Sequence, residues 1–402
     1  MDHLLFLSHR IPYPPNKGDK IRSYHLLKHM CQHYHVHLGT FIDDEDDWQY
    51  VEKVKALCGE TYFGRLNPST ARIGSLTGML SGRPLTLDYY RDAGLKRWVA
   101  GVLQQHKVER FLVFSSAMAQ FVPGQASGTR VIDFVDIDSD KWTQYADKKS
   151  WPMSMVYRRE ARKLLEYERR IAGEFDASLF VSPAEAAMFR SMAPEFAHKI
   201  GAFSNGVDTE YFSPEHALAN PYAAGEVGIV FTGAMDYWPN VDAVEWFAKE
   251  VFPAVLKQHP AAVFYIVGSK PTAQVQALAA LPGVRVTGRV EDVRPYIAHA
   301  RMAVAPLRIA RGIQNKVLEG MAMAQVVAVT PQALEGISAT PGAELLLAED
   351  AAALTATVNA QLARPNPTMG AAARDLVIAH YGWASNLASV DRFFNAELKQ
   401  AA

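Results

Sequence analysis

The sequence predicts an α/β protein with two doubly wound, parallel-sheet domains. Three observations lead to this prediction. Short apolar runs, typical of buried strands, alternate with longer amphipathic segments in the order of βαβ units. The alternation stops over residues 204–226, which are rich in Gly, Pro, Asn and Ala, and then restarts. The length of 402 residues suits two domains of ordinary size.

The first domain is expected over residues 1–203. Its first strand, at 4–8, runs into a polar loop at 11–19, and a helix follows at about 20–32. Further strands are predicted at 36–42, 111–115, 131–135 and 179–182, with helices ending near 58 and spanning 154–174 and 183–192. Strand, loop, helix and strand in this order indicate a parallel sheet.

Residues 204–226 are interpreted as a linker, and a second domain is expected over 227–383. Its strands are predicted at 227–231, 262–267, 284–287, 302–305 and 326–329, and its helices at 241–258, 272–280, 293–299 and 313–324. A last helix, at 386–399 within a segment of about 384–402, is assigned to the first domain. Two such Rossmann-like domains bind ligands at the carboxyl ends of their strands.

The composition is that of an ordinary soluble enzyme, with 49% hydrophobic and 21% charged residues. The net charge of −1 gives no field that favours nucleic acid, so none is expected as a partner. Basic residues prevail over 65–110, which suits either an anionic partner or a solvated surface. Cys31 and Cys58 indicate no disulfide framework and are expected to be reduced. No apolar run approaches a membrane span of about 18 residues, and the start lacks a signal-peptide pattern, so we expect a cytoplasmic protein.

The first candidate loop is Pro15-Asn-Lys-Gly-Asp-Lys-Ile-Arg22, which leads into the first helix. Gly18 permits a close approach of the backbone to a ligand, and a helix N-terminus attracts anions. Lys17 and Arg22, with Lys20 between them, add positive charge on what we interpret as the acceptor or phosphate side. The alternative is a proline-rich turn before a solvated basic helix start.

The second candidate loop, Phe231-Thr-Gly-Ala-Met-Asp-Tyr-Trp-Pro-Asn240, follows the first strand of the second domain. Gly233 permits a tight turn from strand to helix, and Asp236 is either a polar ligand or a helix cap. The cap interpretation is favoured for Asn240, because a helix is expected just after it. Farther along, the backbone of Arg289 and Val290 is a candidate for reading the edge of a base.

The third loop, Pro306-Leu-Arg-Ile-Ala-Arg-Gly-Ile-Gln-Asn-Lys-Val-Leu-Glu319, is the most informative. A diphosphate suits the exposed amides of a helix start that follows a glycine, together with the ammonium of Lys316. Glu319 lies on the same helix face and can accept hydrogen bonds from ribose hydroxyls. The alternative is a surface Lys–Glu pair, which the apolar neighbours disfavour. The donor-binding candidates of this loop are Arg308, Gly312, Ile313, Gln314, Asn315, Lys316 and Glu319.

Several other kinds of site are missing from the sequence. It contains no G-x-x-x-x-G-K-[ST], no H-E-x-x-H, no zinc-like cysteine spacing and no G-x-S-x-G. His25, His29 and His33 recur every four residues and share one helix face, which holds either a metal or simply polar surface.

In order and spacing, these motifs resemble the retaining glycosyltransferases of family 4, which have the GT-B fold. The resemblance covers nearly the whole chain. Its elements are the Gly18 loop, Val181-Ser-Pro-Ala-Glu185, Asn205-Gly-Val-Asp208, Phe231-Thr-Gly-Ala-Met-Asp236, Gly288-Arg-Val-Glu-Asp292 and Lys316-Val-Leu-Glu319. Residues 232–240 and 310–319 are similar to a narrower subgroup, associated with exopolysaccharide loci of the exosortase (PEP-CTERM) system in Gram-negative bacteria. The GT-B fold implies two Rossmann-like domains facing a central cleft and a C-terminal helix that crosses back to the first.

The resemblance implies roles for particular residues. Glu319 matches the second Glu of the family's E-x7-E motif, which holds the donor ribose, whereas the first Glu is replaced by Arg311. This places Arg311 near the transferred sugar, in contact with phosphate or a sugar carboxylate. The usual basic pair is absent from residues 233–240, so the phosphate charge is expected to fall on Lys316, Arg308 and Arg311.

Asp136 stands where many members carry a polar residue of the catalytic cleft, often histidine. With Gly18 and Arg311 it completes the set of catalytic candidates.

The implied reaction transfers a sugar, of hexosyl type, from a nucleotide-diphosphate sugar to a glycan or lipid-linked acceptor, with retention of configuration. Uracil is the base expected from the family. No metal or other cofactor is expected, because helix N-termini and cations can stabilise the leaving diphosphate. Two rival functions stay open: a sugar-nucleotide epimerase of the same fold, and a non-catalytic GT-B partner protein, which the Arg311 departure favours.

Two segments, 155–170 and 73–87, mix basic and apolar residues. They suggest peripheral contact with the inner face of the cytoplasmic membrane, where a lipid-linked acceptor lies. For the first segment, the alternative is a helix within the domain that has a charged outer face.

Overall fold

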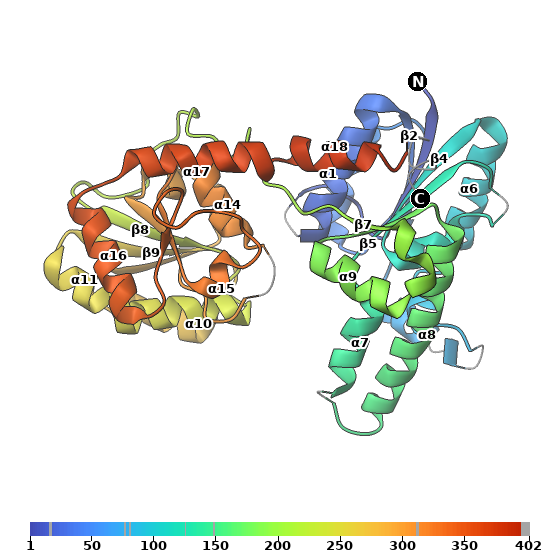
Figure 1. Cartoon of the computed structure of the whole chain (residues 1–402). Coiled ribbons are helices and arrows are strands. Elements are labelled where there is room, and N and C mark those ends of the chain that lie inside the picture. Colours follow the sequence, from blue (N-terminus) through green and yellow to red (C-terminus); the bar gives the residue numbers. More distant parts are fainter. Residues whose placement is uncertain are drawn as a thin grey trace. The chain divides into compact units, whose positions relative to one another are not determined.

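The computed structural model describes residues 1–15, 18–75, 78–79, 82–124, 126–147, 149–310 and 313–394. The chain folds into two compact units: Met1–Ser204 with Asn386–Ala402, and Asn205–Ser385. Each unit has a parallel sheet with helices packed on it, as Figure 1 shows. The predicted α/β class with two Rossmann-like units is confirmed. Among the described helices, none combines the length and the apolar character needed to cross a membrane.

The first unit contains a seven-stranded parallel sheet in the order β3-β2-β1-β4-β5-β6-β7. The central strand β1 pairs with β2 on one side and with β4 on the other. Its apolar run Leu4–Leu7 is fully buried, which explains why this strand reads so clearly in the sequence. The strands are β1 (His3–Ser8), β2 (His35–Ile42), β3 (Thr61–Arg65), β4 (Val108–Phe114), β5 (Thr129–Val135), β6 (Ala177–Phe180) and β7 (Ile200–Ala202).

The helices of the first unit lie between successive strands, and the last helix of the chain ends on this unit. They are α1 (Gly18–His33), α2 (Val51–Lys55), α3 (Pro68–Ser75), α5 (Leu85–Tyr89), α6 (Ala93–Gln105), α7 (Asp138–Asp147), α8 (Met153–Glu174), α9 (Pro183–Met192) and α18 (Trp383–Asp391). Side-chain caps begin two of them: Asp92 accepts a hydrogen bond from the Leu95 amide, and Ser182 accepts one from the Glu185 amide. In Figure 1, α7 and α8 project from the unit as a helical hairpin.

The second unit contains a six-stranded parallel sheet in the order β10-β9-β8-β11-β12-β13. Its strands are β8 (Val227–Thr232), β9 (Ala262–Val267), β10 (Val284–Gly288), β11 (Met302–Ala305), β12 (Val327–Val329) and β13 (Leu346–Leu347). Its helices are α10 (Trp238–Trp246), α11 (Phe252–Gln258), α12 (Ala273–Ala277), α13 (Arg294–His299), α14 (Asn315–Ala322), α15 (Pro331–Leu334), α16 (Ala351–Ala363) and α17 (Pro367–His380).

The helix predicted at 241–258 is interrupted. A π-helical stretch, Phe247–Val251, separates α10 from α11. Pro253 sits in the first turn of α11 and has no N–H to continue the preceding helix, which accounts for the break. The prediction for the cap of α10 is also wrong, because the helix begins at Trp238 and Asn240 lies inside its first turn, buried.

A buried ion pair ties together distant parts of the first unit. Arg22 on α1 is fully buried, and its guanidinium donates to both carboxylate oxygens of Asp133 on β5, at 2.7 and 3.1 Å. It also donates to the carbonyl of Phe203, and its Cζ lies 3.5 Å from the centroid of the Phe203 ring. The prediction that Arg22 faces a phosphate or acceptor is therefore wrong.

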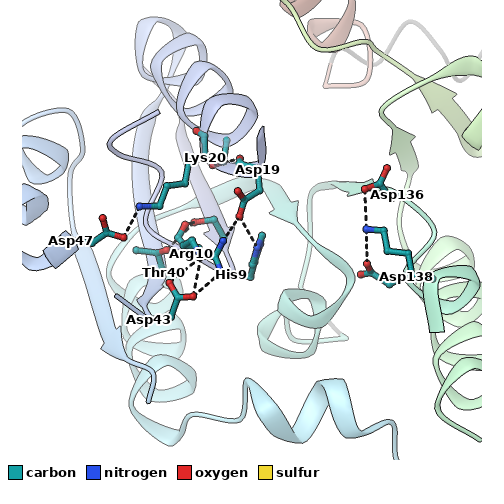
Figure 2. Close-up of polar contacts among 12 residues, drawn as sticks. His9, Arg10, Asp19, Lys20, Thr40, Asp43, Asp47, Asp136 and Asp138 are labelled. Atoms are coloured by element: carbon teal, nitrogen blue, oxygen red, sulfur yellow. Dashed lines mark hydrogen bonds and ion pairs between the residues drawn. The ribbon is translucent and has the colours of Figure 1, made fainter. Parts of the chain in front are cut away.

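Lys20, two residues earlier on α1, is buried as well. Its amine forms an ion pair with the Asp47 carboxylate (Figure 2). The basic start of α1 thus serves packing within the unit, because each described cation already has a carboxylate partner. Lys17 lies outside the described residues.

Replacing Arg22 tests how much the first unit depends on this pair. Arg22→Leu leaves the Asp133 carboxylate buried without its counter-charge, which should lower the free energy of unfolding by about 3–5 kcal/mol. Urea unfolding measures this loss. Arg97→Leu, at an exposed position of α6, is the matched control and should stay within about 0.5 kcal/mol of the parent. The double change Arg22→Met with Asp133→Leu should recover a large part of the loss. If Arg22→Leu and Arg97→Leu lower the free energy of unfolding equally, the first unit does not depend on the ion pair.

Candidate functional site

Both sheets reverse their strand order at a defined point. In the first unit the reversal lies between β1 and β4, and in the second between β8 and β11. In open parallel sheets, the carboxyl ends of the strands at such a point form the usual ligand site. The residues that follow these strands are therefore the first place to look for function.

In the second unit, the loop after β8 is held closely against its neighbours. A Cβ added to Gly268, which follows β9, would lie 1.6 Å from the carbonyl oxygen of Gly233. A Cβ on Gly233 would lie 2.7 Å from Nδ2 of Asn240, so both positions require glycine. Asn240 Nδ2 donates to the Ala234 carbonyl and fixes the turn.

Lys316 reaches this turn from α14. Its amine donates to Oδ1 of Asn240 at 3.0 Å and lies 5.3 Å from the centroid of the Phe231 ring. Gly233, Asn240, Lys316 and Glu319 are called the β8–α14 site below. The structure thus brings the Gly233 loop and the start of α14, two separate donor-binding candidates, close together.

Lys316 and Glu319 are both partly buried, and burial shifts each toward its neutral form. Burial lowers the pKa of Lys316 to about 8, against the opposing charge of Glu319. Burial likewise raises the pKa of Glu319 to about 7, against the charge of Lys316. Among the described residues no hydrogen-bond donor reaches the Glu319 carboxylate. Such a pair gains from a ligand that brings an anion to the amine and hydroxyls to the carboxylate.

The other donor-side candidates differ in what they already contact. The guanidinium of Arg308 is paired with the Asp242 carboxylate, so its charge is largely neutralised. Asp236 is exposed and lies 3.8 Å from the amine of Lys270. Arg289 follows β10 and is exposed, whereas Val290 packs against the core of the unit.

The remaining candidates surround the start of α14. Ile313, Gln314 and Asn315 are partly buried there, and Gln314 forms the N-cap without a side-chain capping bond. Arg311 and Gly312 lie outside the described residues.

The first unit has a cavity of about 570 Å³ at its own reversal point. Residues from the ends of β1, β4 and β5 line it, together with α5 and α7. Its walls combine aromatic rings with charged groups, and the main lining residues are His9, Asp19, Tyr89, Tyr90, Phe114, Asp136, Asp138, Lys141 and Trp142. A pocket of this mixed character suits a sugar, whose faces pack on aromatic rings and whose hydroxyls need polar partners.

Asp136, the catalytic candidate, lines this cavity and is paired with Lys141. The amine of Lys141 lies 2.9 Å from Asp136 and 3.3 Å from Asp138. Figure 2 shows the carboxylates of Asp136 and Asp138 turned toward the same point. Burial by itself lowers the pKa of Lys141, but Asp138 and Asp136 outweigh it and hold the pKa above its usual range.

Sequence reasoning missed His9, which directly follows β1. Its ring is parallel to the Phe114 ring with centroids 5.7 Å apart, and its Nε2 lies 3.5 Å from the Asp19 carboxylate. Arg10 bonds the same carboxylate and also Asp43 (Figure 2). Burial by itself raises the pKa of Asp19, but the His9 hydrogen bond and the Arg10 charge outweigh it and keep the pKa below its usual range. The only hint of His9 in the sequence was its position directly after the first predicted strand.

Gly18 is the first residue of α1, directly before Asp19. A Cβ added there would meet nothing within 4 Å. Packing within the described part of the chain therefore gives no reason for glycine at this position.

Two residues of the cavity wall have unusual backbone conformations. Ser115, after β4, has a φ of 79°, and Val135, at the end of β5, has a φ of 68°. A positive φ is costly for a β-branched residue, and such residues gather at functional sites. The amide of Val135 donates to Oδ1 of Asp133, the partner of Arg22, so the buried ion pair holds the turn that presents Asp136.

Comparisons with known proteins agree with this geometry. The chain is similar to a glycosyltransferase from Rickettsia africae (TM-score 0.64, 13% identity, both chains covered completely). It is also similar to a sucrose-phosphate synthase from Thermosynechococcus elongatus (TM-score 0.64, 17% identity, both chains covered completely). Anabaena HepE in complex with UDP and glucose gives a TM-score of 0.62 at 14% identity, over 98% of this chain and 99% of HepE. These likenesses show the fold, which is GT-B.

A family model described as glycosyl transferases group 1 matches residues 226–364, most of the second unit. Among curated proteins, none matches the sequence significantly. Fold and family match together support a glycosyltransferase with the GT-B fold.

Exchanging Val135 tests whether the cavity wall stores strain. A residue with a Cβ costs about 1–2 kcal/mol in the left-handed region, whereas glycine does not. Val135→Gly should therefore be more stable than Val135→Ala by about 1 kcal/mol, the reverse of the usual order. Denaturant unfolding of both variants measures the difference. Val131→Gly and Val131→Ala, in the interior of the same strand, are the matched pair, and here the alanine variant should be the more stable one. If the alanine variant is the more stable one at position 135 as well, the argument for strain is wrong.

Proposed function

We propose that the protein is a hexosyl-type glycosyltransferase that uses a nucleotide-diphosphate sugar, with a UDP-sugar as the donor. One observation carries the proposal: a partly buried cation, Lys316, lies at the start of α14 against the Gly233 turn, inside the segment that matches the glycosyl transferase family. HepE, a protein of the same fold, has been crystallised with UDP and with UDP and glucose, which favours uracil as the base.

In the proposed complex, the diphosphate lies at the N-terminus of α14. The first amides of that helix have no side-chain cap and Lys316 adds a positive charge, so both stabilise the negative charge that grows on the leaving diphosphate. Glu319 accepts hydrogen bonds from the ribose hydroxyls. Arg308, Arg289 and Asp236 are secondary contacts in this proposal, and Arg308 must first leave Asp242.

The acceptor in this proposal is a glycan or a lipid-linked sugar, bound in the cavity of the first unit. The aromatic rings of Tyr90, Phe114 and Trp142 offer apolar faces, and Asp136 and Lys141 offer partners for hydroxyls. Transfer with retention needs no separate base, because a leaving phosphate oxygen can take the proton of the acceptor hydroxyl. Asp136 then orients the acceptor, and Gly18 and Arg311 complete the catalytic set.

A panel of nucleotides tests the donor site. A ligand at about 100 times its Kd adds roughly 2.7 kcal/mol to the free energy of unfolding. UDP and UDP-sugars should raise the melting temperature, and GDP and ADP should do so less. Lys316→Met and Glu319→Gln should lose most of the rise, whereas Lys257→Met, at an exposed position of α11, should keep it. The absence of any shift in the folded parent protein would favour a non-catalytic partner protein instead.

The pH dependence of the same binding follows from the two shifted groups. The diphosphate needs Lys316 as an ammonium, so affinity should fall above a pH of about 8. The ribose needs Glu319 as a carboxylate, so affinity should also fall below a pH of about 7. Titration with UDP-glucose should therefore give a bell-shaped profile, and Glu319→Gln should flatten its acid limb. A profile that is flat from pH 6 to pH 9 would contradict these roles.

We further place the reaction in exopolysaccharide biosynthesis and at the inner face of the cytoplasmic membrane. The first part rests on the motifs at 232–240 and 310–319. The second is supported by exposed apolar side chains at the tip of the α7–α8 hairpin, named the hairpin tip here: Tyr145, Trp151, Met153 and Met155, with exposed fractions of 52, 78, 44 and 63%.

Cations stand beside the hairpin tip. Lys149 is exposed, and Arg158 and Arg162 are exposed on the next turns of α8. Exposed aromatic and Met side chains flanked by cations are typical of elements that enter the interface of an anionic bilayer. The segment after α3 rests on the same helix, since Arg159 donates to the carbonyls of Gly78 and Arg83. The sequence suggested a membrane contact along the whole of residues 155–170. In the present proposal, the contact is made by the hairpin tip, which includes only the first turn of α8.

Flotation with vesicles of phosphatidylglycerol and phosphatidylcholine tests the membrane contact. The parent protein should float at low salt and less at high salt. Trp151→Ser with Met155→Ser should reduce the floating fraction severalfold, because the apolar anchors are lost. Ile378→Ser, at an exposed position on α17, is the matched control and should float like the parent. No flotation of the parent at low salt would remove the proposal.

A further inference from the structure

The last helix of the chain meets the first helix through a histidine–carboxylate cluster. His29 Nε2 on α1 lies 2.8 Å from Oδ1 of Asp391, at the end of α18. His33, one turn after His29, has its ring centroid 4.9 Å from that of His29. One ligand atom from each of the three residues lies within 4.8 Å of the other two. Figure 1 shows α18 beside α1.

These three groups form a set of ligands for a transition-metal ion. Two imidazoles and a carboxylate are ligands that Zn²⁺ accepts, with bonds of about 2.0–2.2 Å. Histidines four residues apart on a helix point to the same side, so they can hold one ion together. The ligand atoms lie within 4.8 Å of one another, which leaves them farther apart than the ligands of one bound ion. His33 is exposed and has no hydrogen-bond partner among the described residues, so its side chain can rotate to close the set.

His25, the third histidine of the predicted face, does not join the cluster. It is 9% exposed and packs edge-on against the Tyr24 ring. The structure thus replaces the third histidine with a carboxylate from the far end of the chain, which no local spacing could indicate.

A second group of histidines in the first unit is less suited to a metal. His3, His37 and His106 also have ligand atoms within 4.8 Å of one another. However, Nδ1 of His37 accepts the amide hydrogen of Glu60, and its Nε2 lies 2.9 Å from His3 Nδ1. His37 is 3% exposed, so an ion would have to replace hydrogen bonds at a buried ring. At His29, His33 and Asp391, an ion has to replace only the hydrogen bond between His29 and Asp391.

We propose that His29, His33 and Asp391 bind one divalent transition-metal ion of the Zn²⁺ type, which fastens α18 to α1. Three protein ligands leave room for water in the remaining position. The site lies on the outer side of α1 and shares no residue with the cavity or with the β8–α14 site. The role of the ion is structural, because three ligand bonds replace one hydrogen bond. The ion binds at the end of α18, a helix whose first residues belong to the second unit and whose last residues belong to the first.

Calorimetric titration of the full chain, without an affinity tag, with ZnCl₂ tests the proposal. We expect one ion per chain, no comparable heat with MgCl₂, and a Kd at least tenfold weaker in His33→Ala and in Asp391→Asn. Two control variants should bind as the parent does: His380→Ala, an exposed histidine of α17, and His3→Ala in the second histidine group.

Hydrogen exchange gives a readout that is independent of the heat. Zn²⁺ should slow exchange of the amides of α18 in the parent and not in His33→Ala, which removes no contact needed for folding. Loss of binding in His3→Ala alone would assign the ion to the other histidines and overturn the proposal. Equal Kd values for the parent and His33→Ala would overturn it as well.

Discussion

The first unit depends on the buried ion pair between Arg22 and Asp133. One guanidinium joins the first helix, the fifth strand and the carbonyl of Phe203 at the end of the sheet. Placing two charges in an apolar interior is costly, and the cost is offset only when every hydrogen-bonding direction is used. Here the carboxylate and the carbonyl accept hydrogen bonds from the guanidinium, and the Phe203 ring covers its face, so the geometry of β5 is tightly constrained. This constraint lies behind the strained turn at Val135 and the position of Asp136 in the cavity.

The second unit also holds a cation inside the fold, but the hydrogen-bond partner of this cation is an amide oxygen and not a carboxylate. Glycines at 233 and 268 let two strand ends approach closely, and Asn240 fills the space that a side chain at 233 would occupy. Lys316 reaches into this turn and finds a neutral amide oxygen as its hydrogen-bond partner. The turn is therefore held by close packing and hydrogen bonds within the unit itself.

The sequence allowed both sheets to be predicted, because strands such as β1, β8 and β9 are short runs of buried apolar residues. It missed β3 and β7, where most of the residues are only partly buried and the pattern is weak. Gly233 and Lys316 could be predicted as donor-binding candidates, because both follow strands of one parallel sheet, but the hydrogen bond from Lys316 to Asn240 could not. The burial of Arg22 could not, since its partner lies 111 residues away and a basic helix start looks the same whether it is buried or solvated. His9 was missed for the same reason: only the folded chain brings Asp19 and Phe114 to it.

Arg22, a structural cation, differs in its surroundings from Lys316, the cation of the proposed donor site. Both lie near the starts of helices that follow strand ends, Arg22 fully buried and Lys316 partly buried. Arg22 meets the Asp133 carboxyl in a bidentate contact, so its guanidinium has a fixed partner within the fold. Lys316 has an amide oxygen and the nearby Glu319, and burial moves the pKa of each of these two groups toward neutrality instead of locking them as a pair. Incomplete compensation of a partly buried charge is therefore the physical argument behind the proposal that a ligand binds at the β8–α14 site.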